Sequence, residues 1–376
     1  MTLLIWSTDI VIHRRFKRYG TWSYPGVATI ECYCFESDCV TMALKPQVNK
    51  ELEEKSKFNR SIVWRNVIIL SLLHLGALAG LYLSFTSVKY MTILFAIFLY
   101  EFSLLGISVG AHRLWSHRSY KAKWPLQLLL AFMNTVAFQV GVFNELHFVN
   151  NGNDLKSYFY RYFIQDSVIV WAKDHRVHHK FSDTDADPHN PNVGFFFSHI
   201  GWLLCKKHPD VTKKDKTIDI SDLESNAILA FQKKYYTILV ILLCFVLPTV
   251  IPVVFWKEKW LNAYLIPGVL RHILLLNVAL MINSIGHRYG YKPYDKYINA
   301  SDNIMFFILS SGEGWHNYHH VFHQDYRAIE LKNPINLIKM FIDFFTKIGW
   351  AYDLKYASDE TVKKRMKRTG EQYNYN

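Results

Sequence analysis

Cysteine is scarce in this chain of 376 residues, and its five cysteines show neither the spacing of a metal site nor a paired disulfide framework. Three of them lie in the first forty residues, a distribution that favours a reduced surface facing the cytosol. A thiolate-based zinc or iron–sulfur site is therefore not expected. The five cysteines are Cys32, Cys34, Cys39, Cys205 and Cys244.

The chain also has no convincing secretory signal and no recognisable nucleic-acid-binding motif. It opens with "MTLLIWSTDIVIHRRFKRYG", in which the apolar stretch is short and the basic residues follow it rather than precede it. Lysine and arginine outnumber aspartate and glutamate by 43 to 31, which gives a net charge of +12. With nucleic acid set aside, this excess predicts other anionic partners, namely phosphate-bearing ligands, lipid head groups or an acidic protein.

Hydrophobic residues make up 51% of the chain, and the charged residues are concentrated between long apolar runs. This pattern predicts a polytopic membrane protein with a substantial polar part. A membrane-spanning helix needs about 20 apolar residues. Four stretches meet that requirement, at about 63–85, 90–111, 235–255 and 263–285.

Basic residues gather where the first span begins and where the second ends. By the positive-inside rule, both ends of each pair of spans then face the cytosol, as do both termini. The segment 125–138, "PLQLLLAFMNTVAF", is too short to cross and predicts a buried or interfacial helix. We therefore expect an all-α protein with four transmembrane helices in two hairpins and a cytosolic helical cap. The basic residues are Lys55, Lys57, Arg60, Arg65, Arg113, Arg118, Lys121 and Lys123.

Nine of the 17 histidines fall into four short motifs, "HRLWSH", "HRVHH", "NSIGH" and "HNYHH", all at cytosolic span ends or in cytosolic segments. The i, i+3, i+4 spacing of two motifs predicts three imidazoles on one helix face, and Asn283 lies one turn before His287. His112 and His117 are five residues apart, so we expect one of them beyond a helix end. Isolated histidines are interpreted as structural. The nine are His112, His117, His175, His178, His179, His287, His316, His319 and His320.

These motifs predict a dinuclear metal site. One ion accepts about four to six ligands, so two ions sharing the nine imidazoles and Asn283 is the simplest arrangement. Thiolates and inward carboxylates are absent from the motifs, which argues against iron–sulfur clusters and carboxylate-rich di-iron bundles. We predict a redox-active iron pair beneath a membrane bundle, suited to oxygen activation. A histidine-rich metal transporter is the alternative from another class, but it predicts ligands at mid-membrane depth.

Four longer segments resemble the animal acyl-CoA desaturases, and insect members in particular. They are "GAHRLWSHRSYKA", "WAKDHRVHHKFSDTDADPHNP", "GFFFSHIGWLL" and "GEGWHNYHHVF", and the similarity extends from about residue 63 to the C-terminal tail. The resemblance implies a multi-pass enzyme of the endoplasmic reticulum membrane that inserts a cis double bond into a fatty acyl-CoA. It implies two iron ions, O2 as co-substrate, and electrons from cytochrome b5 and its NADH-dependent reductase. We expect Δ9 desaturation, with Δ11 or another position, or hydroxylation, as alternatives.

The resemblance also implies roles for individual residues. The nine clustered histidines match the metal ligands of the family, and Asn283 matches a position that reaches iron through water. Lysine replaces the commoner arginine at 173 and 206, which keeps the positive charge but loses the bidentate fork. A solvated basic face is an equal alternative for these lysines. The positions that match the acyl-CoA path are Asn66, Trp171, Lys173, Asp174, Lys206 and Lys207.

The segment 140–165 departs from the family pattern. Deleting its 26 residues joins Gln139 to Asp166 and restores that pattern. The segment begins with valine, whose codons start with GT, and ends with glutamine, for which CAG is a codon, so its ends match a splice donor and acceptor. We interpret it as an in-frame retained intron. A tolerated surface loop is the alternative, and a catalytically impaired isoform is a third possibility.

Three further expectations concern organisation and specificity. Residues before Met42 resemble nothing in the family, so 1–41 is interpreted as translation upstream of the native start. The expected domains are an N-terminal tail at 1–61, a membrane and catalytic domain at 62–345, and a basic cytosolic tail at 346–376. Glu101 is a carboxylate within the second span and hence a functional candidate. Leu104 lies near the expected end of an acyl tunnel, where a bulky residue would favour a shorter chain or another double-bond position.

Overall fold

The computed structural model describes residues 17–24, 28–35, 38–45, 60–138, 167–328 and 336–371. The segment 140–165 lies outside these residues. The chain divides into two compact units, Met1–Asn59 and Arg60–Asn376. In the first unit, three strands form an antiparallel sheet with β2 in the middle, and Met42 lies within β3, where it pairs with Cys32. The strands are β1 (Lys17–Tyr24), β2 (Ala28–Phe35) and β3 (Asp38–Lys45).

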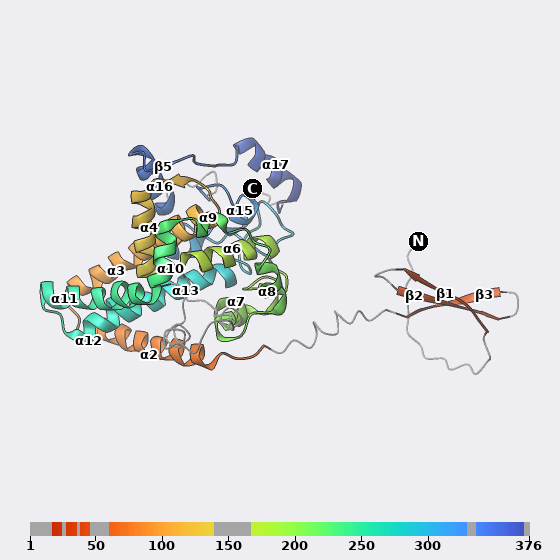
Figure 1. Cartoon of the computed structure of the whole chain (residues 1–376), viewed down its shortest axis with the longest axis horizontal. Helices are drawn as coiled ribbons and strands as arrows, with labels where there is room; N and C mark the ends of the chain where they lie inside the picture. Colours follow the sequence, from red (N-terminus) through yellow and green to blue (C-terminus); the bar gives the residue numbers. More distant parts are fainter. Residues whose placement is uncertain are drawn as a thin grey trace, which may run out of the picture. The chain divides into compact units, whose positions relative to one another are not determined.

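The second unit contains four helices that are long and apolar enough to cross a membrane, as predicted, and it is mostly helical. They run together, with the turn between α11 and α12 at one end and α6 at the other (Figure 1). The second helix continues to Ser116, beyond its predicted end at 111, and the third begins at Ala227, before its predicted start at 235. The first helix is α2 (Trp64–Thr86) and the second joins α3 (Tyr90–Leu105) to the π-helix η1 (Gly106–Ser116). The third joins α10 (Ala227–Val240), η5 (Ile241–Val246) and α11 (Leu247–Trp256), and the fourth joins α12 (Trp260–Ala263), η6 (Tyr264–Leu270) and α13 (Arg271–Ser284).

The end of the bundle farthest from the histidines is fastened by a buried carboxylate, Glu258. Thr92 Oγ1 and the Lys89 backbone N–H donate to its Oε2 at 2.6 and 2.9 Å, and Asn262 Nδ2 donates to its Oε1 at 3.0 Å. The carboxylate therefore ties the turn between the first two spans to the turn between the last two. Hydrogen bonds to an ionised group are among the stronger ones in proteins.

A buried arginine, Arg271, joins three elements in the middle of the fourth span, with 2% of its surface exposed. Its guanidinium donates to the carbonyl oxygens of Val136 at 2.8 Å and of Cys244 and Pro267 at 3.0 Å each. In hydrocarbon every freed backbone carbonyl must find a donor. Arg271 supplies that donor at the carboxyl end of α4 (Trp124–Ala137) and within the π-helical turns η5 and η6.

The helix α4 is apolar on both its buried and its exposed faces. Leu126 and Leu130 are buried, whereas Trp124, Leu128 and Phe132 are exposed at intervals of four residues. It packs along the second span, where the rings of Phe132 and Phe102 meet edge to face. The prediction of a buried or interfacial helix at 125–138 thus agrees with its packing.

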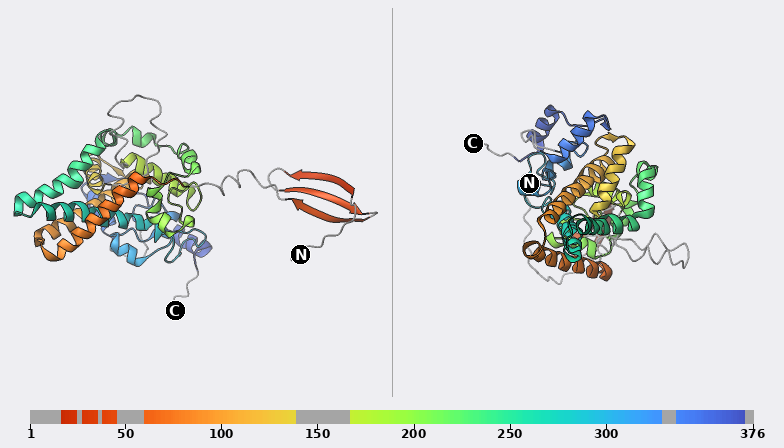
Figure 2. Two further views of the ribbon diagram at one scale, coloured as in Figure 1. Left: turned by 90° about the horizontal axis from the view of Figure 1, so that it is seen from below. Right: turned by 90° about the vertical axis from the view of Figure 1, so that its left-hand side faces the viewer.

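The remaining elements form the cap at one end of the four spans (Figure 2), and two of its helices, α6 and α15, carry six of the nine clustered histidines. The described residues after 346, up to 371, are folded onto this cap, because β5 pairs with β4 and Val362 of α17 packs among Tyr294, Trp315 and Tyr318. The other cap elements are α6 (Val168–Phe181), η3 (Pro191–Val193), α7 (Phe195–His199), η4 (Gly201–Leu204), α8 (Pro209–Asp215), α9 (Ser221–Glu224), α14 (Ile304–Leu309), α15 (His316–Val321) and α16 (Leu337–Lys347). The pairing strands and last helix are β4 (Lys121–Ala122), β5 (Ala351–Tyr352) and α17 (Asp359–Thr369).

Candidate metal centre

All nine clustered histidines converge, and they do so in two groups. Within each group the candidate ligand atoms lie within 4.8 Å of one another. Most of the nine rings are buried, so the groups are shielded from bulk water. The first group is His112, His117, His175, His179 and His319, and the second is His178, His287, His316 and His320.

The π-helix η1 explains how the pair five residues apart comes together. In a π-helix the backbone bond runs from residue i+5 to residue i, and the His117 N–H donates to the His112 carbonyl at 3.1 Å. The two residues therefore stack one turn apart, with ring centroids 4.9 Å from each other. His117 caps this helix just beyond its last residue, as the sequence predicted.

The two H-x-x-H-H triplets divide between the groups, which corrects the prediction of three imidazoles on one face. On α6, His175 and His179 belong to the first group while His178 belongs to the second. On α15 the assignment is reversed: the i, i+4 pair belongs to the second group and His319 to the first. Each helix thus contributes to both groups and holds them side by side.

The nitrogen atoms of the two groups are spaced as ligands of a common ion would be. In the first group Nε2 of His112 lies 2.9 Å from Nε2 of His319, which lies 3.0 Å from Nε2 of His179. In the second, Nε2 of His316 lies 3.0 and 3.1 Å from those of His287 and His320. Metal–imidazole bonds of about 2.1 Å at right angles place neighbouring nitrogens about 3.0 Å apart, whereas a tetrahedron places them about 3.4 Å apart. The residues present therefore fit metal ions with more than four ligands.

Burial keeps most of these imidazoles in the neutral, ligating form. It lowers the pKa of His117, His175 and His179 well below the usual value, and neighbouring histidines lower it further. The same holds for the three histidines of α15. A metal ligand must be deprotonated, so this environment suits a cation and disfavours a proton.

Three carboxylates lie behind the histidines, a feature that the sequence analysis missed when it described inward carboxylates as absent. Asp187 Oδ1 accepts from His178 Nδ1 at 2.8 Å, and Glu313 Oε1 accepts from His112 Nδ1 at 3.2 Å. Asp183 Oδ1 lies 3.5 Å from His287 Nδ1. A hydrogen bond at Nδ1 leaves Nε2 free to bind metal and fixes the orientation of the ring.

Two of these carboxylates are ionised at neutral pH despite their burial. Burial raises the pKa of Asp187, but His178 more than compensates and holds this pKa at about 2. The pKa of Glu313 is likewise about 2, because Arg113 and His112 outweigh the cost of burial. Arg113 and Glu313 thus form a buried ion pair behind His112. Arg113 also donates to the carbonyl of Tyr326 at 2.9 Å.

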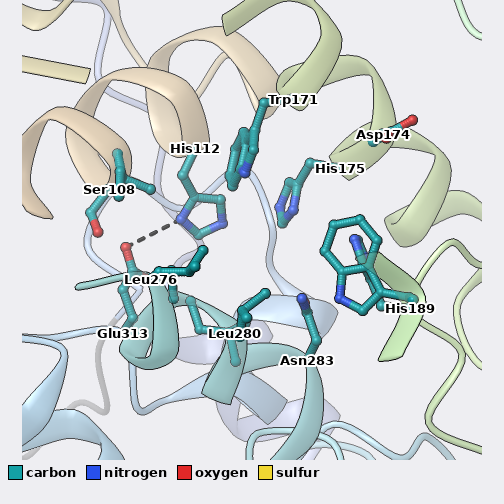
Figure 3. Close-up of a pocket in the computed structure, with 14 residues that line it drawn as sticks. Ser108, His112, Trp171, Asp174, His175, His189, Leu276, Leu280, Asn283 and Glu313 are labelled. Atoms are coloured by element: carbon teal, nitrogen blue, oxygen red, sulfur yellow. Dashed lines mark hydrogen bonds and ion pairs between the residues drawn. The ribbon is translucent and has the colours of Figure 1, made fainter. Parts of the chain in front are cut away.

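An apolar pocket lies against the histidine groups, between η1, α6 and α13. Figure 3 shows His112, His175 and Asn283 facing this pocket, with Glu313 bonded to His112. Trp171 stacks on His175 at 5.0 Å between centroids. The wall on α13 is formed by Leu276, Ala279, Leu280, Ile282 and Asn283.

A second hollow adjoins the first and shares Trp202 with it. Its wall carries the cations Arg60, Lys206 and Lys207 and the carboxylates Asp185 and Asp187, so positive side chains outnumber negative ones by three to two. An apolar pocket and a basic hollow therefore lie next to each other, with Trp202 between them. This arrangement suits a ligand with an apolar chain and an anionic head.

The residues predicted along the acyl-CoA path occupy different positions. Trp171 and Asp174 line the apolar pocket, and Lys206 and Lys207 line the basic hollow. Lys207 Nζ also donates to Asp174 Oδ1 at 2.7 Å, which places an ion pair where the two spaces meet.

The other predicted positions lie behind the walls. Lys173 pairs with Asp215 at 2.7 Å, and Asn66 Nδ2 donates to the Leu203 carbonyl at 2.7 Å. Leu104 packs with Ile107, Ala137 and Leu275 behind the apolar pocket.

Two further residues qualify the sequence analysis. Glu101 accepts from Ser311 Oγ at 3.0 Å and fastens the second span to the loop after α14, so the structure gives it a packing role. His189, interpreted as an ordinary structural histidine, lines the apolar pocket and meets the Trp202 ring edge to face at 4.3 Å. No spacing rule connects His189 or Trp202 to the histidine motifs, so their place beside the pocket becomes visible only in the fold.

The chain is similar to known desaturases over most of its length. Residues 122–324 match the family model described as "Fatty acid desaturase". The chain is 50% identical over 343 residues to an acyl-CoA Delta-9 desaturase of Acheta domesticus, covering 90% of this chain and 88% of the relative. It is 50% identical over 337 residues to an acyl-CoA Delta(11) desaturase of Spodoptera littoralis, covering 89% of each. A stearoyl-CoA desaturase of Homo sapiens is 47% identical over 309 residues, which cover 82% of this chain and 79% of the relative. This protein therefore belongs to the fatty acid desaturase family.

Proposed function

We propose that the protein is an acyl-CoA desaturase that introduces a cis double bond at the Δ9 position of a saturated fatty acyl-CoA. The two histidine groups would hold two iron ions, O2 would be the oxidant, and cytochrome b5 would supply the electrons. The observation that carries the proposal is the apolar pocket, which is lined by both His112 and His175 and lies next to a basic hollow on the other side of Trp202. We also propose that it resides in the endoplasmic reticulum membrane with both termini in the cytosol.

When bound by the histidines, the iron ions would supply the oxidising chemistry that removes two hydrogens from neighbouring carbons. In the same reaction O2 is reduced to two waters with two electrons from cytochrome b5. The chain itself binds and orients the substrate. Lys206 and Lys207 attract the phosphates of CoA, Trp202 separates head from chain, and the apolar wall of α13 excludes water from the acyl chain.

The Δ9 assignment is supported by the relative from Acheta domesticus, which is named a Delta-9 desaturase. A Δ11 activity is the second candidate, because two relatives named Delta(11) desaturases are equally similar, at 50% and 51% identity. Both reactions begin with the same removal of hydrogen and differ only in which carbon lies beside the metal. The choice therefore depends on how deeply the acyl chain enters the pocket.

A histidine-rich transporter is disfavoured by where the ligands lie. The groups form at the end of the second span and in the cap, with His287 three residues beyond the fourth span. A transporter would place ligands near the bilayer midplane. About two iron ions per chain would support the enzyme, whereas exchangeable zinc alone would support transport.

Expression in a yeast strain that lacks its own desaturase tests the activity directly. The full chain and a form without 140–165 are expressed, and the position of new double bonds is read by mass spectrometry of derivatised fatty acids. A new Δ9 product from either form supports the proposal, and a Δ11 product corrects the position alone. The absence of unsaturated product from both forms, with both proteins present in the membrane, would refute the proposal.

A further inference from the structure

A chain of buried and partly buried polar side chains lies between α2, α7 and α13, away from the histidine groups. It consists of His74, Asn277, His199 and Ser284, and none of these residues belongs to the candidate metal centre. Around it packs an apolar cluster that includes Leu70, Ile273 and Leu280. Polar groups in such surroundings are costly unless every donor and acceptor is paired.

The hydrogen bonds of this chain can be assigned one by one. His74 Nδ1 lies 2.7 Å from the Leu70 carbonyl, which can only accept, so Nδ1 carries the proton and Nε2 is an acceptor. Asn277 Nδ2 donates to that Nε2 at 3.3 Å and to the Ile273 carbonyl at 2.8 Å. The amide orientation of Asn277 is thereby fixed, with its oxygen facing His199.

The second half of the chain follows from the first. His199 Nε2 donates to Asn277 Oδ1 at 3.2 Å, which leaves Nδ1 of the neutral ring to accept from Ser284 Oγ at 3.0 Å. Burial lowers the pKa of His199, in keeping with a neutral ring. Ser284 Oγ also lies 3.2 Å from the Leu280 carbonyl, so its single proton is shared between that carbonyl and His199 Nδ1. Sliding α7 against α13 would break at least one of these bonds.

His199 joins α7 to α13, and both helices are connected to walls of the apolar pocket. On one side, α7 leads directly into η4, whose Trp202 separates the apolar pocket from the basic hollow. On the other side, α13 contributes Leu276, Leu280 and Asn283. The polar chain therefore sets how the tryptophan and the α13 wall face each other. A slip of one helical residue would move that wall by about 1.5 Å, which is comparable to the spacing of neighbouring carbons in an acyl chain.

We propose that the His74–Asn277–His199–Ser284 chain is a positioning element that fixes the register of the two pocket walls and so selects acyl chain length and the position of the double bond. This inference rests on the proposed acyl-CoA desaturase function. In this role His199 positions Trp202 and α13 and takes no part in the reaction itself. It also gives a functional reason for two histidines that sequence analysis interpreted as structural.

The test compares His199→Phe, which keeps a ring but removes both hydrogen bonds, with His199→Gln, which keeps one donor and one acceptor. Asn277→Leu breaks the chain at a second point, should His199→Phe fail to accumulate. Ser84→Ala is the matched control, because Ser84 bonds only to the Gly80 carbonyl of its own helix. Metal content and elution as a single species confirm that each variant is folded.

The first readout needs no turnover: equilibrium binding of palmitoyl-CoA and stearoyl-CoA is measured for each protein. Palmitoyl-CoA and stearoyl-CoA differ by two methylenes, and a fitted apolar pocket distinguishes even one methylene by roughly tenfold. We expect the wild type and Ser84→Ala to discriminate by at least about tenfold, and His199→Phe and Asn277→Leu to discriminate by about threefold or less. His199→Gln should recover part of the difference. The second readout is the ratio of double-bond positions in yeast, in which the minor product should increase in the same order.

The outcomes separate the two proposals. If the wild type binds neither acyl-CoA, the proposed function is refuted and the inference falls with it. If the wild type binds both equally, or if His199→Phe and Asn277→Leu keep its discrimination and product ratio, the positioning role alone is refuted.

Discussion

Replacing one carboxylate should remove one metal ion and leave the other. Asp187 is fully buried and contacts the second histidine group only through His178. Its Oδ1 also accepts from the His189 backbone N–H at 3.0 Å, and its Oδ2 accepts from the Asp183 N–H at 3.1 Å. In Asp187→Asn the amide nitrogen must face one of these donors, so at least one bond is lost whichever way the amide is turned.

The magnitude follows from the lost bond. A hydrogen bond to an ionised group contributes about 1.5–3 kcal/mol, and about 1.4 kcal/mol corresponds to a factor of ten in affinity. We therefore expect the second group to bind iron about 10- to 100-fold more weakly, the range seen when partners of metal-ligating histidines are changed. At a chelator concentration that the wild type resists, Asp187→Asn should retain about one ion per chain instead of two.

A variant of the carboxylate behind the first histidine group tests the same reasoning on the other ion. Glu313 supports only His112, which belongs to the first group, so Glu313→Gln should also retain about one ion, but in the other group. The double variant should retain none. Asp343→Asn is the control, because Asp343 bonds to Lys339 and Tyr326 outside the centre. Total bound transition metal is measured by mass spectrometry, and loss of both ions in either single variant would show that the nine histidines form one inseparable cluster.

Three further predictions concern the bundle and the pocket. Arg271→Met removes the guanidinium that donates to three carbonyl oxygens and should lower the free energy of unfolding by about 3 kcal/mol, seen as a lower Tm in detergent, with exposed Arg288→Met as control. Leu104→Ala opens space behind Ile107 and should shift yeast products towards longer chains; an unchanged chain-length profile would contradict this. Burial raises the pKa of Glu258, but the hydrogen bonds to its carboxylate outweigh burial and lower this pKa overall. The ionised carboxylate should therefore stabilise the fold at neutral pH, and this stabilisation should be lost as the pH falls through the lowered pKa. The Tm of the wild type should then fall in acid more steeply than that of Glu258→Gln.

The sequence predicts the spanning helices well, because hydropathy depends on composition alone. The first span was expected at 63–85 and is found at Trp64–Thr86. The second was expected to end at 111 but continues to Ser116, since its last turns leave the apolar run and continue as a π-helix. Side-chain periodicity carries no signal for an i→i+5 backbone bond, so the device that brings His117 to His112 was beyond prediction.

The supporting groups of the centre were not predicted, for a different physical reason. Asp187 and Glu313 lie in loops, where no period relates a residue to its partner. Arg271 was missed because its acceptors are backbone carbonyls of residues 27 and 135 positions away, and any residue type can supply such carbonyls. Motif spacing therefore indicates which groups could bind a metal, and the tertiary fold decides which groups orient them.

The division of each triplet between two metal groups follows from helix geometry and could have been derived beforehand. Successive residues of an α-helix are about 100° apart, so residue i+4 lies about 40° from residue i on one side and residue i+3 about 60° from it on the other. His178 and His179 are thus about 100° apart and cannot face one ion equally. On α6 the i, i+4 pair faces the first group, and on α15 it faces the second. An H-x-x-H-H motif is therefore suited to bridging two adjacent ions, and two such helices with opposite assignments hold five and four imidazoles in two neighbouring sites.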